Sequence, residues 1–306
     1  MFLQVNNLIK SYGSKSVLEN ISFNQEKGEI ISLIGTSGIG KSTLLKFLAG
    51  LCSIDSGNIT LNSNKIHNLE ANNRKISFVF QESPLFPHIN LLDNILFNMS
   101  SYDKKKLDFL LEKTELKNLV KRFPFEISGG ENQRAAVVRS LIRNPDLLLL
   151  DEPFSNLDTV NKKYVKEIVF EIIKESNLTT IIVNHDIEES LEISDRIMII
   201  NDGIIDAIDT PENIYKNPKN LSTAQLFGDV TSLEVENKKR YIRPENIKIV
   251  EKSPYDIEVK KSFYLGEKYR ISAKLGDDII DLYHNTNLMQ GSNLYIDFNK
   301  EDILNF

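Results

Sequence analysis

A glycine-rich stretch near the N-terminus carries the residue types that bind phosphate. It consists of Gly35, Thr36, Ser37, Gly38, Ile39, Gly40, Lys41, Ser42 and Thr43. The spacing G-x-x-x-x-G-K-[ST] is typical of a loop whose backbone N–H groups surround a nucleotide phosphate. In such a loop Lys41 reaches the β- and γ-phosphates, and the Ser42 hydroxyl takes a place on Mg²⁺. A flexible Gly/Ser turn is the alternative, which the flanking strand and helix patterns disfavour.

Two adjacent carboxylates, Asp151 and Glu152, follow a run of four leucines that predicts a buried strand. Ligands of parallel α/β sheets bind at the carboxyl ends of the strands, so both side chains can face the phosphate loop. We expect Asp151 to hold Mg²⁺ opposite Ser42, and Glu152 to act as general base on the attacking water. An ordinary Asp-Glu turn after a strand is the alternative.

Gln81 and His185 end two other predicted strands. The Gln81 amide can touch both Mg²⁺ and the attacking water, and His185 can donate to the γ-phosphate. The alternatives are a polar strand end and a structural histidine. His67, His88 and His284 have no comparable setting and are interpreted as surface or packing residues.

Two further features suggest nucleotide contacts. Tyr12 lies in a turn where its ring could stack on adenine, although its residue type alone favours a packed loop tyrosine. Ser128, Gly129 and Gly130 open a predicted helix with a capping serine and close-approach glycines, which makes a second anion-binding helix start. Two such starts can serve one nucleotide if two copies of the chain face each other.

The elements that must position these residues follow from apolar periodicity. The patterns predict strands at 3–10, 17–23, 30–34, 58–61, 74–81, 147–150 and 178–183, a hairpin at 195–208, and helices at 91–97, 103–121, 131–143, 164–174 and 221–227. After Gly228 short alternating segments separated by turns dominate. We therefore predict two domains, a nucleotide-binding domain at 1–228 and a β-rich domain at 229–306.

Composition limits the partners and the compartment. The formal net charge of −6 disfavours broad binding to nucleic acid or to anionic membranes. The single cysteine, Cys52, allows no internal disulfide and favours a reducing compartment. The N-terminus does not resemble a signal peptide, and no apolar run is long enough to span a bilayer. Any membrane work is therefore expected to need another chain.

With these residues in order, the chain resembles the ATP-binding cassette (ABC) ATPases. The glycine-rich loop matches their Walker A motif, Leu147–Glu152 their Walker B motif, and Gln81 their Q-loop. The segment at 127–134 is similar to their signature motif, and His185 to their switch histidine. Their D-loop matches the segment that contains Asp158, and Tyr12 falls where the family keeps an adenine-stacking aromatic residue.

The resemblance implies a P-loop α/β cassette with antiparallel β and helical subdomains, followed by a small all-β module. It also implies ATP and Mg²⁺ as cofactors and a head-to-tail homodimer. Each ATP would lie between the phosphate loop of one copy and Ser128, Gly129, Gly130 and Glu131 of the other. ATP binding closes such a dimer and hydrolysis reopens it.

The tail, with Tyr241–Asn246 near its start, is similar to the TOBE/OB-like tails of importer ATPases for sugars, polyamines, sulfate, molybdate or ferric iron. That group implies a membrane permease docked near residues 82–99, a solute-binding protein, and a place at the cytoplasmic face of the inner membrane. It implies no nucleic-acid partner. The tail is about half the length seen in sugar importers, which favours a small inorganic ion such as ferric iron as the solute.

Two departures and two alternatives accompany this interpretation. Glu131 stands where the family usually has Gln and is expected to weaken dimer closure modestly, and Asn184 replaces a common Thr. One alternative is a soluble ABC ATPase acting on ribosomes or DNA, but such proteins usually carry two cassettes or a coiled-coil insertion. The other is a non-catalytic sensor, which the presence of Lys41, Glu152 and His185 disfavours.

Overall fold

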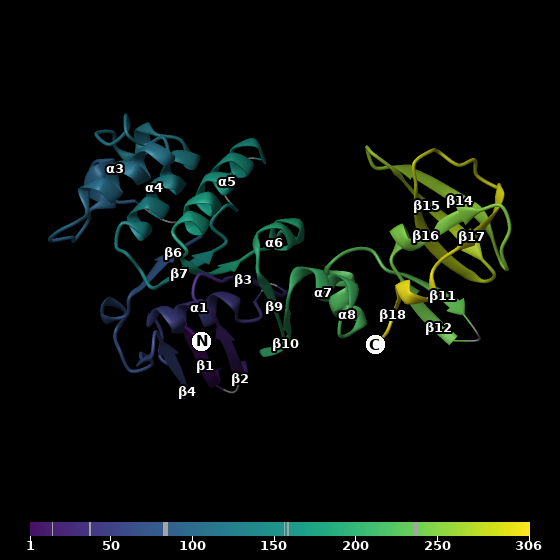
Figure 1. The fold of residues 1–306 in the computed structure, drawn as a ribbon, viewed down its shortest axis with the longest axis horizontal. Helices are drawn as coiled ribbons and strands as arrows, with labels where there is room; N and C mark the ends of the chain where they lie inside the picture. The colour runs from purple at the N-terminus through teal and green to yellow at the C-terminus, as the bar shows by residue number, and fades with distance from the viewer. Residues whose placement is uncertain (14, 37, 82–84, 156, 158, 236–237) are drawn as a thin grey trace. The chain divides into compact units, whose positions relative to one another are not determined.

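The computed structural model describes residues 1–306 except 14, 37, 82–84, 156, 158 and 236–237. The chain separates into two compact units, Met1–Pro211 and Glu212–Phe306 (Figure 1). In the described part of the chain, no helix is long and apolar enough to cross a membrane.

The first unit is built around a six-stranded sheet with the order β10-β9-β3-β8-β7-β6. Its strands are β3 (Ile30–Ile34), β6 (Ile76–Val79), β7 (Leu147–Asp151), β8 (Thr179–Val183), β9 (Arg196–Asn201) and β10 (Ile204–Asp209). All neighbouring pairs are parallel except the β9–β10 hairpin. The carboxyl ends of the parallel strands therefore meet at one edge, where the candidate site residues follow them.

Both faces of this sheet are covered, because side chains alternate along each strand. In β7, Leu147 and Leu149 pack toward helix α1 (Lys41–Ala49), while Leu148 and Leu150 pack into the opposite core. Beyond α1 lies a second, antiparallel sheet with the order β2-β1-β4-β5 (Figure 1). Its strands are β1 (Leu3–Tyr12), β2 (Lys15–Gln25), β4 (Ser56–Leu61) and β5 (Asn64–Lys65).

The helices that contribute to the opposite core are α2 (Leu91–Ile95), α3 (Lys104–Lys113), α4 (Gly129–Leu141), α5 (Thr159–Glu175) and α6 (Ile187–Ile193). Short 3₁₀ turns lie at Ala71–Asn73 and Pro124–Glu126. The expected helix at 103–121 ends at Lys113. The Thr114 hydroxyl there donates to the Leu110 carbonyl at 2.6 Å, and Glu115 takes a positive φ of 56°. The left-handed residue turns the chain, and Leu116 enters the core from a loop.

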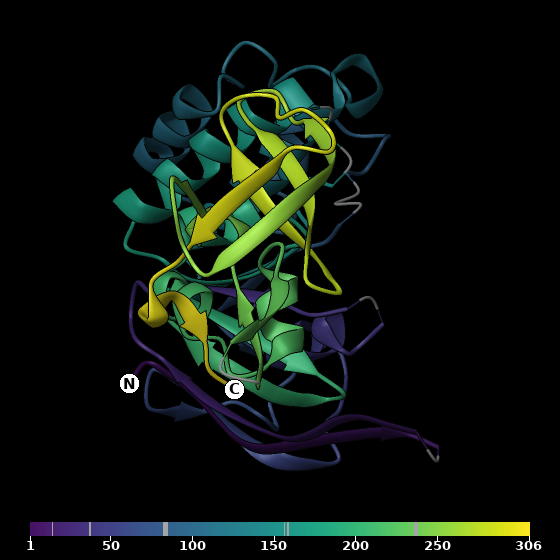
Figure 2. The ribbon, with the colours of Figure 1, turned by 90° about the vertical axis from the view of Figure 1, so that its right-hand side faces the viewer.

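The second unit contains two antiparallel sheets, with the orders β11-β12-β18 and β13-β17-β14-β15-β16 (Figure 2). Its strands are β11 (Thr231–Val235), β12 (Lys238–Ile242), β13 (Lys248–Val250), β14 (Tyr255–Tyr264), β15 (Tyr269–Leu275), β16 (Asp278–His284), β17 (Asn293–Asp297) and β18 (Ile303–Leu304), with 3₁₀ turns at Pro244–Asn246 and Lys300–Asp302. Their inward side chains form a separate apolar core. The expected all-β tail is therefore confirmed.

The division between the units lies after Pro211, earlier in the chain than the expected boundary at 228/229. The reason is the buried Arg243, which is only 2% exposed. Its guanidinium donates to the carbonyls of Ala224 at 3.0 Å and Tyr215 at 3.2 Å, and it lies 4.0 Å from the centre of the Tyr215 ring. Tyr215 and Ala224 belong to α7 (Pro211–Lys216) and α8 (Leu221–Leu226), so these helices join the β-rich unit.

Candidate functional site

The phosphate loop joins the end of β3 to the start of α1. A Cβ atom at Gly35 would lie 2.4 Å from the Ile200 carbonyl oxygen, so the loop needs glycine there. Gly40 is the N-cap of α1, with φ at 108°, and no side chain caps the helix. The first N–H groups of α1 are therefore left for an anion. Ser37 lies outside the described residues.

Lys41 lies within the phosphate loop. Its Nζ donates to the carbonyl oxygens of Gly35 at 2.7 Å and Thr36 at 2.9 Å. Burial lowers the pKa of Lys41, and the charges of Glu152 and Asp151 oppose that shift. The ammonium therefore lies beside the start of α1. Its charged form is poorly hydrated there, and a nearby anion stabilises it.

Ser42 and Asp151 are brought together from α1 and β7. The Ser42 hydroxyl donates to Asp151 Oδ1 at 2.9 Å. Burial raises the pKa of Asp151, the Ser42 hydrogen bond lowers it, and the Glu152 charge raises it further. A buried carboxylate beside a hydroxyl and a second carboxylate favours a cation, and these oxygen ligands suit Mg²⁺. The described residues contain no cluster of three or more His, Cys, Asp or Glu side chains able to hold a metal alone.

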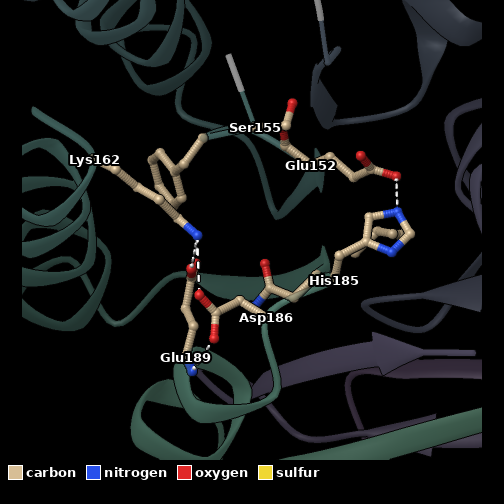
Figure 3. A pocket seen from close by; sticks show the side chains of 9 residues that line it. Glu152, Ser155, Lys162, His185, Asp186 and Glu189 are labelled. Atoms are coloured by element: carbon tan, nitrogen blue, oxygen red, sulfur yellow. Dashed lines mark hydrogen bonds and ion pairs between the residues drawn. The ribbon is translucent and has the colours of Figure 1, made fainter. Parts of the chain in front are cut away.

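Glu152 joins the two other predicted site residues. Its Oε1 lies 2.6 Å from His185 Nε2 (Figure 3). Its Oε2 accepts a hydrogen bond from Gln81 Nε2 at 3.0 Å. The three residues follow β7, β8 and β6, which are neighbours in the sheet. Glu152 also takes a positive φ of 48°, an unusual backbone conformation for a glutamate. This turn carries its carboxylate to the position between the two partners.

The second predicted anion site begins α4. The Ser128 Oγ accepts from the Glu131 N–H at 3.3 Å, and the Glu131 carboxylate accepts from the Ser128 N–H at 2.6 Å. This capping box satisfies the N–H groups of Ser128 and Glu131 within their own chain. The Ser128 N–H is the main cause that lowers the pKa of Glu131. In the described part of the chain, no hydrogen bond joins Ser128, Gly129, Gly130 or Glu131 to the phosphate loop.

Tyr12 ends β1 with an exposed ring, which is 54% accessible. Lys10 Nζ lies 5.3 Å from its ring centre. The ring is therefore not packed as an ordinary loop tyrosine would be. Asp158, the predicted D-loop residue, lies outside the described residues. The Gly38, Ile39 and Thr43 positions fall in the loop and the first turn of α1, as expected.

Sequence reasoning missed two residues that support the site. Arg74 is buried and donates to the carbonyls of Phe47 at 2.6 Å and Leu48 at 2.9 Å at the C-terminal end of α1. A cation there complements the helix dipole and anchors the helix whose other end carries Lys41. The side chain of Asn184, one of the two departures, lies 3.5 Å from Ser32 Oγ and ties the end of β8 to β3. No spacing signal in the sequence marks either contact.

Comparison with known proteins identifies the family. The ABC transporter profile matches residues 18–155. A sulfate/thiosulfate import ATP-binding protein of Pseudomonas aeruginosa is 33% identical over 92% of this chain and 90% of its own length. An Fe(3+) ions import ATP-binding protein of Haemophilus influenzae is 39% identical over 74% of this chain and 67% of its own length. The chain belongs to the ABC transporter family.

A solved structure supports the same family assignment. It is the dimeric post-hydrolysis state of the ATP-binding cassette MJ0796 bound to ADP and Pi, with a TM-score of 0.60 and 28% identity. The match covers 68% of this chain and 98% of that one. The predicted ABC cassette fold and the predicted class, an importer ATPase, are thereby confirmed. The individual residue roles and the solute stay predictions.

Proposed function

We propose that this chain hydrolyses ATP with Glu152 as the general base. The observation that carries the proposal is the position of the Glu152 carboxylate, which contacts both Gln81 and His185 at the edge of the sheet. A carboxylate so held can accept a proton from water as the water attacks the γ-phosphate. His185 would steady Glu152 and donate to the γ-phosphate, while Gln81 would help to position the water.

Ser42, Gln81 and Asp151 would hold Mg²⁺ with the ATP phosphates. The ion would neutralise charge on the β- and γ-phosphates. Ser42 and Asp151 already share a hydrogen bond of 2.9 Å, so their oxygens converge on one place. Lys41 and the bare start of α1 would bind the phosphates, and the exposed Tyr12 ring would stack on adenine.

The working unit would be a head-to-tail homodimer. One copy carries both a phosphate loop and the Ser128–Glu131 segment, but in the described residues no hydrogen bond links them. The segment would act on the ATP of a second copy. The similar cassette MJ0796 is described as dimeric with ADP and Pi, which supports this arrangement.

The general-base role is tested with Glu152→Gln. The amide keeps the size of the side chain and one of its two acceptor oxygens but cannot take a proton from water, so kcat for ATP hydrolysis should fall at least about 100-fold. ATP binding should be preserved, and size-exclusion chromatography with ATP should show a trapped dimer. Steady-state phosphate release measures kcat.

The matched control is Glu29→Gln. Glu29 precedes β3 and pairs with Arg196 at 3.3 Å, away from the Gln81–Glu152–His185 group. Its turnover should stay within about twofold of the parent, because the change removes the charge of a carboxylate remote from the site, and the amide oxygen can still accept the Glu26 N–H that Glu29 Oε2 accepts at 2.7 Å. Unchanged turnover in Glu152→Gln itself would sink the assignment.

A permease would dock in a groove lined by Phe78, Phe86, Phe97, Arg139 and Arg143. The rings of Phe86 and Phe97 lie 4.4 Å apart and remain partly exposed. The fully buried Asn94 holds the backbone of Phe86 through hydrogen bonds of 2.7 and 3.0 Å. A fixed aromatic floor beside two arginines suits an apolar segment with an acidic residue. Of these residues, Phe86 and Phe97 belong to the predicted docking region at 82–99, of which 82–84 lie outside the described residues.

Docking is tested with Phe86→Asp, which places a charge on the aromatic floor. Co-purification with a co-expressed permease subunit should be lost, while nucleotide affinity stays unchanged. Phe109→Asp is the control, since Phe109 has a similar exposure of 43% but lies on α3 outside the groove. Intact co-purification of Phe86→Asp would count against the groove.

The assembly would work at the cytoplasmic face of the inner membrane with an external solute-binding protein. Its solute would be a small inorganic ion, because the relatives are named for sulfate, thiosulfate and Fe(3+) import. Ferric iron, the solute favoured by the sequence, and sulfate are separated by uptake of each radiolabelled ion into cells that carry the parent chain or Glu152→Gln.

A further inference from the structure

Two helices that follow the proposed catalytic residues are joined by a compact ion-pair group. Lys162, on the first turn of α5, lies 3.0 Å from Asp186 Oδ2 and 3.3 Å from Glu189 Oε2 (Figure 3). Helix α5 begins soon after Glu152, and Asp186 directly follows His185. These residues line a cavity of about 320 Å³ that Glu152 and His185 also line. The ion-pair group therefore lies beside the proposed site and does not contact the residues that would bind the phosphates.

Both carboxylate oxygens of Asp186 are in use. Oδ2 pairs with Lys162, and Oδ1 accepts the Glu189 N–H at 3.2 Å, which makes Asp186 the N-cap of α6. Asp186 is thereby held from two directions, by its own helix and by α5. The backbone of the preceding residue, His185, is therefore held together with Asp186.

His185 depends on such an anchor because its own side chain is half exposed, at 50%. Its hydrogen bond to Glu152 Oε1 is short, at 2.6 Å, but an exposed ring has few packing contacts to keep it there. Glu189 shows the opposite environment. Its side chain is 4% exposed, and burial raises its pKa while the Lys162 charge lowers it. A buried carboxylate of this kind needs a cation to stay in place.

We propose that Lys162 is a positioning residue that holds His185 on Glu152 by fixing the start of α6 against α5. This inference rests on the proposed roles of Glu152 and His185. Lys162 contacts neither of them and acts through Asp186 and Glu189. Its loss should lower turnover without changing ATP affinity, because a small displacement of a positioned group reduces the rate of the chemical step.

The fold supplies a matched control one turn further along the same helices. Lys166 on α5 pairs with Glu192 on α6 at 2.7 Å, but Glu192 is 66% exposed and lies away from His185. The test compares Lys162→Met/Glu189→Gln with Lys166→Met/Glu192→Gln in the full chain. The first removes the pairs of Lys162 with Glu189 and with Asp186, and the second removes the Lys166–Glu192 pair. Neither leaves an unpaired buried carboxylate, because the Asp186 side chain is 45% exposed.

The first double variant should lower kcat about tenfold and leave the KM for ATP within about twofold. The second should leave both within about twofold. Lys162→Arg should retain kcat. In the His185→Ala background the first double variant should cause no further loss, since the residue it positions is gone. Equal kcat in the two double variants, or a full further loss in the His185→Ala background, would overturn the proposal.

A spectroscopic readout separates positioning from a general loss of structure. The chain has four histidines, so the His185 ring signal in a ¹H–¹³C spectrum can be assigned with His185→Ala. It should shift or broaden in Lys162→Met/Glu189→Gln and stay in place in the control. An unmoved signal contradicts the inference. If Glu152→Gln and His185→Ala keep full turnover, the proposed catalytic roles fail. If those two lose turnover and Lys162→Met/Glu189→Gln does not, only the role of Lys162 fails.

Discussion

The starts of α1 and α4 are both glycine-rich helix N-termini, but they satisfy their N–H groups differently. At α1 the N-cap is Gly40, and no side chain accepts from the helix. At α4 the N-cap is Ser128, and a reciprocal pair of hydrogen bonds with Glu131 closes the helix start. At α1 no side chain accepts from the first N–H groups, whereas at α4 side chains already accept from the N–H groups of Ser128 and Glu131.

This difference indicates a division of labour between the two sites. The α1 start has an ammonium, Lys41, held beside free N–H groups, so it can bind phosphate on its own. The α4 start carries a carboxylate, and its Ser128 hydroxyl already accepts one hydrogen bond. It is suited to add a contact to a phosphate that another copy has bound. Binding should depend on α1, and dimer closure on α4.

The largest effect is expected from a substitution at the start of α1. Lys41→Met removes the ammonium, so the affinity of the single copy for ATP should fall roughly 10- to 100-fold. Ser128→Ala should leave that affinity within about twofold, and should instead prevent the ATP-trapped dimer of Glu152→Gln. Fluorescent-nucleotide titration and size-exclusion chromatography measure the two results.

Ser128→Ala also removes an N-cap, which should cost about 1 kcal/mol of unfolding free energy. Urea unfolding of the variant checks that it is folded under the conditions of the dimer assay. Equal losses of single-copy affinity in Lys41→Met and Ser128→Ala would show that the two helix starts do not divide their tasks.

The smallest expected effect concerns the charge at α4. Glu131→Gln can keep a hydrogen bond to the Ser128 N–H while removing the negative charge. The ATP-trapped dimer should tighten, by about twofold, because a carboxylate near the facing phosphates is lost. A Glu131→Gln dimer weaker than the parent would reverse the assigned role of the charge.

The same substitution has a defined pH dependence. The pKa of Glu131 is held below its ordinary value of 4.5 in the folded chain. The stability that its carboxylate contributes is therefore present above the unfolded pKa and is lost as the pH falls through the folded value. The difference in unfolding free energy between parent and Glu131→Gln should shrink from about pH 5 to pH 3. A difference that stays constant over this range would contradict the capping contact.

The sequence predicted the central elements well where strong periodicity and a buried environment agree. The four leucines of β7 form a strand buried on both faces, and β8 and the β9–β10 hairpin lie where they were expected. It did not predict α6 or α7, which are short and have no clear apolar repeat. The predicted helix at 103–121 was also too long, since the helix ends at Lys113. Leu116 and Leu119 continue the apolar helical period, although the chain turns at Glu115.

The residue types and their spacing by themselves determined the phosphate loop, the carboxylates after β7, and the polar ends of β6 and β8. Local chemistry suffices to predict them, because a glycine-rich turn before a helix exposes backbone N–H groups that favour an anion. Only the tertiary structure decided that Gln81 and His185 meet on Glu152, that Glu131 closes the start of α4, and that Lys162 ties α5 to α6. These contacts join residues far apart in the chain or depend on one backbone turn, so they follow from strand order and packing rather than from any local pattern.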